Sequence, residues 1–113
     1  MEKRLRALEG QIAKIKKEIS SLGDLRPGSL SEQFNVCGKA GCSCKDVPPR
    51  KHGPYYQLSF TRKGRSGTKF VKRHQVATVR KQLKNYAQLR ALVDRWVELS
   101  TELCQLRLEN MQT

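Results

Sequence analysis

Residues 37–44 read Cys37-Gly38-Lys39-Ala40-Gly41-Cys42-Ser43-Cys44, and eight positions later the chain continues His52-Gly53-Pro54-Tyr55-Tyr56. Three of the four cysteines and one of the two histidines thus fall close together. A structural zinc site takes four thiolate or imidazole ligands in a tetrahedron, and glycines allow the tight loop that such a site requires. The pattern predicts a structural Zn²⁺ site with the ligands Cys37, Cys42, Cys44 and His52.

The spacing of these residues is not the usual pair of C-x2-C knuckles, so other interpretations stay open. The cysteines can be free thiols packed in a loop, or two of them can form a disulfide. His52 can support the site or the turn at Gly53-Pro54 without binding metal. Cys104, the fourth cysteine, lies in a helical stripe, where we expect burial as a small apolar side chain.

Residues 2–22 are predicted to form a helix that needs a partner surface. Its apolar residues recur in steps of three and four, the spacing of a coiled-coil seam. They are Leu5, Leu8, Ile12, Ile15, Ile19 and Leu22.

Residues 24–54 are expected to be mostly irregular. Pro27-Gly28 marks a turn, and Ser29 with Glu32 fits a capping box that begins a short helical turn. Pro48-Pro49 and Gly53-Pro54 exclude regular helix and indicate a loop.

Residues 55–61 and 68–73 are predicted to be two strands of a β-hairpin, joined by a basic, glycine-containing connection at 62–67. Tyr56, Leu58 and Phe60 share one face of the first strand. The opposite face carries Tyr55, Gln57, Ser59 and Thr61.

Residues 75–110 are predicted to be one long helix with two apolar stripes. The early stripe is Val76, Val79, Leu83 and Tyr86, and the later one is Leu89, Leu92, Trp96, Leu99, Leu103 and Leu106. The simplest arrangement places helix 2–22 antiparallel along residues 89–110, either within one chain or across a homodimer.

These elements indicate a small α+β protein of one structural domain. It has an N-terminal coiled-coil helix in residues 1–24, a zinc-knuckle-like loop with a basic β-hairpin in residues 25–74, and a long C-terminal helix in residues 75–113. A chain of 113 residues often needs a metal or a partner chain for stability. We therefore expect a homodimer through the helical seams.

The net charge of +13 is concentrated in the middle of the chain, where residues 25–74 carry eleven Lys and Arg against two Asp and Glu. No acidic residue occurs between Val47 and Val93. A polyanion is the expected partner, because neutralised phosphates release condensed counterions. A solvated basic surface without one particular ligand is the alternative.

We expect most of the central basic residues to contact phosphates rather than read bases, and we favour DNA over RNA. Tyr55 and Tyr56 can stack on unpaired bases or belong to the sheet core, Tyr56 more readily than Tyr55. The candidate nucleic-acid-binding residues are Arg50, Lys51, Arg62, Lys63, Arg65, Lys69, Lys72, Arg73, Arg80, Lys81 and Lys84.

An enzyme is not expected. Phosphoryl transfer usually needs carboxylates that hold metal ions, and the central region offers only Glu32 and Asp46. A closed Cys3His site leaves no open position for a zinc hydrolase. His74 lacks an evident nucleophile or orienting acid nearby in sequence and is expected at the entry of a helix.

The N-terminus lacks the apolar core of a signal peptide, and no apolar run is long enough for a membrane span. We expect a cytoplasmic, prokaryotic protein without a membrane partner. In a reducing compartment, clustered cysteines bind metal more often than they form disulfides.

The motif Cys-Gly-Lys-x-Gly-Cys-x-Cys, followed by His-Gly-Pro-Tyr-Tyr, a basic hairpin and a long helix, resembles a family of short bacterial and archaeal proteins described as a domain of unknown function. The resemblance covers roughly Arg26 to Leu106, so helix 2–22 looks like a variable addition. It supports Cys37, Cys42, Cys44 and His52 as one ligand set. The family often accompanies transposases or other mobile elements.

Together these features predict a nucleic-acid-binding accessory or regulatory protein of a mobile element, with a structural zinc site. The alternative is a protein-interaction adaptor whose helices bind a transposase or recombinase.

Overall fold

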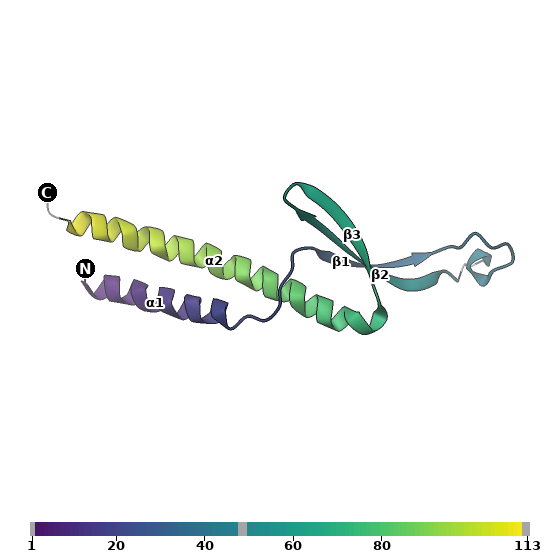
Figure 1. The fold of residues 1–113 in the computed structure, drawn as a ribbon, viewed down its shortest axis with the longest axis horizontal. Coiled ribbons are helices and arrows are strands. Elements are labelled where there is room, and N and C mark those ends of the chain that lie inside the picture. The colour runs from purple at the N-terminus through teal and green to yellow at the C-terminus, as the bar shows by residue number, and fades with distance from the viewer. Residues whose placement is uncertain (1, 48–49, 112–113) are drawn as a thin grey trace. The chain divides into compact units, whose positions relative to one another are not determined.

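The computed structural model describes residues 2–47 and 50–111, and it confirms the predicted α+β class (Figure 1). The prediction for Pro48-Pro49 lies outside the described residues. Within the described part, no helix combines the length and the hydropathy needed to cross a bilayer. The elements in chain order are helix α1 (Glu2–Ser20), strand β1 (Ser29–Asn35), 3-10 helix η1 (Ser43–Lys45), strands β2 (His52–Arg62) and β3 (Arg65–Val71), 3-10 helix η2 (Arg73–Gln75) and helix α2 (Val76–Asn110).

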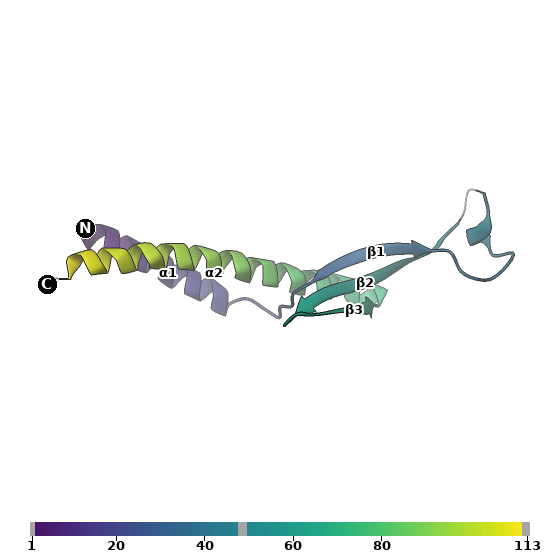
Figure 2. The ribbon, with the colours of Figure 1, turned by 90° about the horizontal axis from the view of Figure 1, so that it is seen from above.

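The chain divides into a helical unit, Met1–Leu25 with Lys84–Thr113, and a sheet unit, Arg26–Leu83. In the helical unit, α1 lies antiparallel along the distal part of α2 (Figures 1 and 2). The two helices bury the predicted seams against each other within one chain, and exposed ion pairs between Arg4 and Glu102 and between Arg107 and Glu9 flank them. The buried core of this unit is Leu8, Ile12, Ile15, Leu99 and Leu103.

The expected burial of Cys104 is wrong, because this side chain is exposed. Leu103 is in the core of the helical unit. One further residue along a helix turns the side chain by about 100°, so Cys104 leaves the face that α1 covers.

The sheet unit holds three antiparallel strands in the order β1-β2-β3. The first turns of α2 pack on one face of the sheet, which we call the inner face. Its buried residues are Leu58, Val71, Val76 and Val79, with Leu30, Tyr56, Phe60 and Leu83 partly buried around them. The prediction that Tyr56, Leu58 and Phe60 share one face of β2 is therefore confirmed, and this face is the one that packs on α2.

The sequence interpretation missed strand β1, and the predicted helical turn at Ser29 is wrong. Ser29 instead pairs with Ser59, and the ladder continues to Asn35 opposite His52. The segment is mostly polar, so its own pattern gives little strand signal, and the pairing partner β2 decides its conformation. His52, Gly53 and Pro54 likewise belong to β2 rather than to the expected loop.

The predicted six-residue connection at 62–67 is also shorter in the structure. Lys63 and Gly64 alone make the turn, with φ angles of 53° and 76°, as two-residue hairpin turns of type I′ require. The strands consequently extend to a last rung at which Arg62 lies opposite Arg65.

Candidate metal centre and nucleic-acid interface

The four predicted metal ligands come from the loop that joins β1 to β2, at the end of the sheet away from the β2–β3 turn. Cys37 follows the end of β1, Cys42 and Cys44 flank the start of η1, and His52 begins β2. Asn35 pairs with His52 in the ladder, so the two strands bring the ends of the loop together. The loop with η1 lies beyond this strand pair in both views (Figures 1 and 2).

Local backbone geometry explains how the loop turns back. Gly41 has a φ of 80°, which favours glycine. The N–H of Lys45 donates to the Cys42 carbonyl at 2.9 Å and that of Asp46 to the Ser43 carbonyl at 3.0 Å. These bonds close η1 and direct Cys42 and Cys44 toward the same point.

The structure brings all four predicted ligands together. Their ligating atoms lie within 4.8 Å of one another, close enough to hold a metal ion. Cys37 Sγ lies 3.5 Å from Cys44 Sγ, and Cys42 Sγ lies 3.1 Å from His52 Nε2. Zn–S bonds of about 2.3 Å in a tetrahedron place two sulfurs about 3.8 Å apart, so the donor set and its spacing are compatible with zinc.

The surroundings of the thiols differ. Cys44 is 1% exposed, and burial raises the pKa of its thiol. A hydrogen bond from the Lys39 backbone N–H lowers the pKa of the Cys37 thiol, and the contact with Cys44 acts in the same direction. The Cys37 N–H also donates to Cys44 Sγ at 3.3 Å, as backbone donors do around a thiolate. All four cysteines of the chain are free.

Every candidate nucleic-acid-binding residue is exposed. Arg50 and Lys51 precede β2, and Arg62, Lys63 and Arg65 surround the β2–β3 turn. Among the described residues, the ion pairs are Arg4–Glu102, Arg95–Glu98 and Arg107–Glu9, so no acidic side chain neutralises any of these candidates. The remaining ones are Lys69 on β3, Lys72 and Arg73 at the entry to η2, and Arg80, Lys81 and Lys84 on α2.

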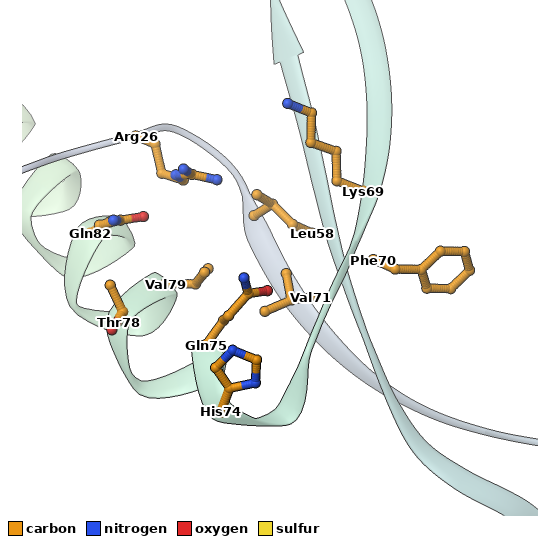
Figure 3. A pocket seen from close by; sticks show the side chains of 10 residues that line it. All are labelled: Arg26, Leu58, Lys69, Phe70, Val71, His74, Gln75, Thr78, Val79 and Gln82. Atoms are coloured by element: carbon orange, nitrogen blue, oxygen red, sulfur yellow. The ribbon is translucent and has the colours of Figure 1, made fainter.

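A pocket of about 360 Å³ lies on the inner side of the sheet unit, between the sheet and the first turns of α2 (Figure 3). Leu58, Val71 and Val79 form its apolar part. Its polar side chains are Arg26, Lys69, His74, Gln75, Thr78 and Gln82. The predicted place of His74 at a helix entry is confirmed, since η2 leads directly into α2.

Two residues of this region were not singled out from the sequence. The Arg26 guanidinium lines the pocket, and the Arg26 backbone N–H donates to the Gln82 carbonyl at 3.3 Å. Phe70 points away from the other lining residues (Figure 3) and is 78% exposed. Successive side chains of a strand point to opposite faces. The sequence of β3 could therefore have indicated that Phe70 faces away from the core if Val71 faces toward it.

Comparison with known proteins gives one family match. Residues 5–81 match the family described as Domain of unknown function (DUF6788). The match includes α1, which the resemblance had suggested to be a variable addition, and it ends before Leu106. No curated protein and no solved structure matches the chain. Since the match spans about two thirds of the 113 residues and contains the whole Cys/His site, the chain belongs to the DUF6788 family.

Proposed function

We propose that this protein binds nucleic acid, DNA in preference to RNA, through a basic module that a structural zinc ion stabilises. The observation that carries the proposal is the unopposed charge of the sheet unit. Residues Arg26–Leu83 contain thirteen Lys and Arg against two Asp and Glu, a net charge of +11. Phosphates are the ligands that neutralise such a surface and release counterions on binding.

Zinc would be held by Cys37, Cys42, Cys44 and His52. Four protein ligands complete a tetrahedral shell, as in structural sites, and leave no position for a reacting water. The site would fix the loop end of β1 and β2, where Arg50 and Lys51 precede the second strand. We assign the site a structural role and the protein no enzymatic one.

Phosphate contacts would come mainly from the β2–β3 turn and the first turns of α2. Arg62 lies opposite Arg65 at the last rung of the β2–β3 ladder. Lys69, farther along β3, lies opposite Leu58. Arg80 and Lys84 are four residues apart on α2 and so share one face of the helix. Exposed side chains without acidic neighbours suit contacts to a flexible phosphate backbone.

The setting we propose is an accessory or regulatory role for a mobile element in the prokaryotic cytoplasm. This part of the proposal rests on the resemblance of the Cys/His motif and on the four free cysteines, since thiols stay reduced in the cytoplasm.

We further propose that the protein is a homodimer. The predicted seams already pack against each other within one chain, so the interface would use a second stripe of α2 that contains the exposed Val93, Val97 and Leu108.

The adaptor alternative would use the same stripe to bind a transposase or recombinase. Salt separates the two functions, because binding through phosphates weakens steeply with salt whereas an apolar helical interface hardly responds.

The test is a DNA titration at several salt concentrations with the wild type and with the triple variant Arg62→Ala, Lys63→Ala, Arg65→Ala. We expect a steep salt dependence for the wild type and a shallower slope for the variant, since each lost phosphate contact removes about 0.9 from the slope. Unchanged affinity of the variant would disprove the assignment to the hairpin turn. A wild type that fails to bind DNA at low salt would disprove the function itself.

A further inference from the structure

The outer face of the sheet, opposite the face that packs on α2, carries two exposed aromatic side chains. Phe70 on β3 is 78% exposed and Tyr55 on β2 is 43% exposed. By contrast, the aromatic residues Tyr56 and Phe60 of β2 pack against the core of the sheet unit. An exposed phenyl ring on a paired strand stabilises the free protein little, because so much of it stays in water.

The two aromatic residues belong to one site. Phe70 lies opposite Gln57 in the β2–β3 ladder, and Gln57 is two residues from Tyr55 on the same face. Diagonal neighbours on one face of a sheet lie within reach of aromatic side chains. A hollow of about 370 Å³ is lined by Tyr55 and Phe70 together with Pro54, Tyr56, Val71, Lys72 and Arg73.

The rest of this face is polar and free of acids. Its residues on β2 and β3 are Gln57, Ser59, Thr61, Ser66 and Thr68. On β1, Ser31 and Gln33 face the same way, since they pair with Gln57 and Tyr55. Two aromatic rings on an otherwise polar sheet face, beside Lys72 and Arg73, are typical of surfaces on which unpaired bases stack.

We infer that the outer face of the sheet is a platform for single-stranded nucleic acid, with one base stacked on Phe70 and a neighbouring base on Tyr55. This inference rests on the proposed nucleic-acid binding and names the strandedness of the ligand. Lys72 and Arg73 contact the phosphates beside the stacked bases. Bases in a duplex are already stacked on their neighbours, so their faces are unavailable to the platform.

Charge favours nucleic acid over a protein as the occupant. An apolar protein surface would need a larger apolar patch than two aromatic rings among serines, threonines and glutamines. The basic side chains at the edge of the hollow match phosphates, and every base offers a face for stacking whatever its sequence.

The experiment measures the affinity of the full chain for a labelled oligothymidine and for a duplex of the same length, at one fixed salt concentration. Three variants are compared with the wild type: Phe70→Leu, Phe70→Trp and the control Thr68→Ala. Leucine keeps an apolar side chain but removes the ring, tryptophan keeps a ring, and Thr68 lies on the same face of β3 without one. Melting temperatures are recorded for all variants.

We expect Phe70→Leu to weaken oligothymidine binding about tenfold, because stacking on an aromatic ring contributes roughly 1–3 kcal/mol per base. Phe70→Trp should retain the affinity, and its indole fluorescence should be quenched by oligothymidine beyond the quenching seen in the wild type, which contains Trp96. Thr68→Ala and the affinity for the duplex should stay unchanged. All melting temperatures should stay near that of the wild type, since the ring is exposed.

Equal oligothymidine affinities of Phe70→Leu and the wild type would overturn the platform but not the proposed nucleic-acid binding, as long as the wild type binds DNA. Binding of the duplex without any binding of oligothymidine would likewise overturn the platform alone. A wild type that binds neither probe at low salt would overturn both proposals.

Discussion

Arg62 and Arg65 lie directly opposite each other at the last rung of the β2–β3 ladder. Like charges in this position destabilise a hairpin, by an amount comparable to the 0.2–1 kcal/mol that opposite charges contribute. The neighbouring rung, in which Thr61 Oγ1 and Ser66 Oγ lie 3.0 Å apart, supplies polar contact but no counter-charge. An anion between the two side chains would relieve this repulsion, so the pair agrees with the phosphate contact proposed for the β2–β3 turn.

The first prediction uses this repulsion. Arg65→Glu replaces it with an attraction to Arg62, so we expect the melting temperature to rise by about 2–5 °C while DNA affinity falls at least about tenfold. Thermal unfolding and a DNA titration measure the two effects. Arg6→Glu, an exposed position on α1, makes the same change in net charge outside the sheet unit. If Arg6→Glu weakens DNA binding as much as Arg65→Glu does, net charge rather than the hairpin turn decides affinity.

The second prediction concerns the metal. We expect one zinc ion per chain in native mass spectrometry, and we expect Cys44→Ser to lose it. Loss of a ligand from a structural site should lower stability by about 3 kcal/mol, or about 12 °C in melting temperature. Cys104→Ser changes an exposed cysteine of the helical unit and should alter neither quantity. Full zinc content in Cys44→Ser would remove this residue from the ligand set.

A related prediction concerns thiol accessibility in the zinc-bound protein. Cys104 is exposed, whereas the other three cysteines are partly or fully buried and close enough to share a metal. Iodoacetamide should therefore label one thiol per chain rapidly, and a chelator should make the other three reactive, because the metal competes for the thiolates. In Cys104→Ser the rapid label should disappear. Rapid labelling of all four thiols before chelation would contradict a closed site.

The sequence predicted the convergence of the Cys/His residues better than it predicted the sheet around them. Ligand identity depends on residue type and spacing, and Cys37, Cys42, Cys44 and His52 do converge. Both helices were predicted nearly to their ends because their apolar residues repeat at helical spacing over many turns. Those patterns are properties of each segment alone.

The features that the sequence did not predict depend on partners. Strand β1 contains mostly polar residues, and its conformation is decided by pairing with β2. Gly53 illustrates the same dependence: with a φ of 138°, it sits where an added Cβ would lie 2.7 Å from the Gln33 carbonyl oxygen. This close approach arises only when β1 pairs with β2, and the sequence interpretation did not include β1. Gly53-Pro54 therefore looked like part of a loop.

A further prediction tests the pocket between the sheet and α2. The Oε1 atom of Gln82 is buried without a hydrogen-bond partner among the described residues. Replacing a buried polar group by an apolar one of similar shape removes its desolvation cost. We expect Gln82→Met to leave the melting temperature unchanged or to raise it by a few degrees, about 1 kcal/mol in stability. The control is Gln105→Met on the exposed part of α2, which should have no effect. A clear fall in the melting temperature of Gln82→Met alone would show that the amide already has a partner in solution.

The last prediction concerns the proposed homodimer. Val97 lies near the centre of the second stripe of α2 and is 58% exposed in the single chain. It also lines an apolar groove with Val93, Trp96 and Ser100. A carboxylate at this position would be buried without a partner if two copies pack there, which is strongly unfavourable. Val97→Glu should therefore be monomeric by light scattering at concentrations at which the wild type is dimeric, with a helix content close to that of the wild type by circular dichroism. Ala91→Glu introduces the same charge at an exposed position outside the stripe and should remain dimeric. A wild type that is monomeric at high concentration, or a Val97→Glu variant that stays dimeric, would show that this stripe is not the interface between copies.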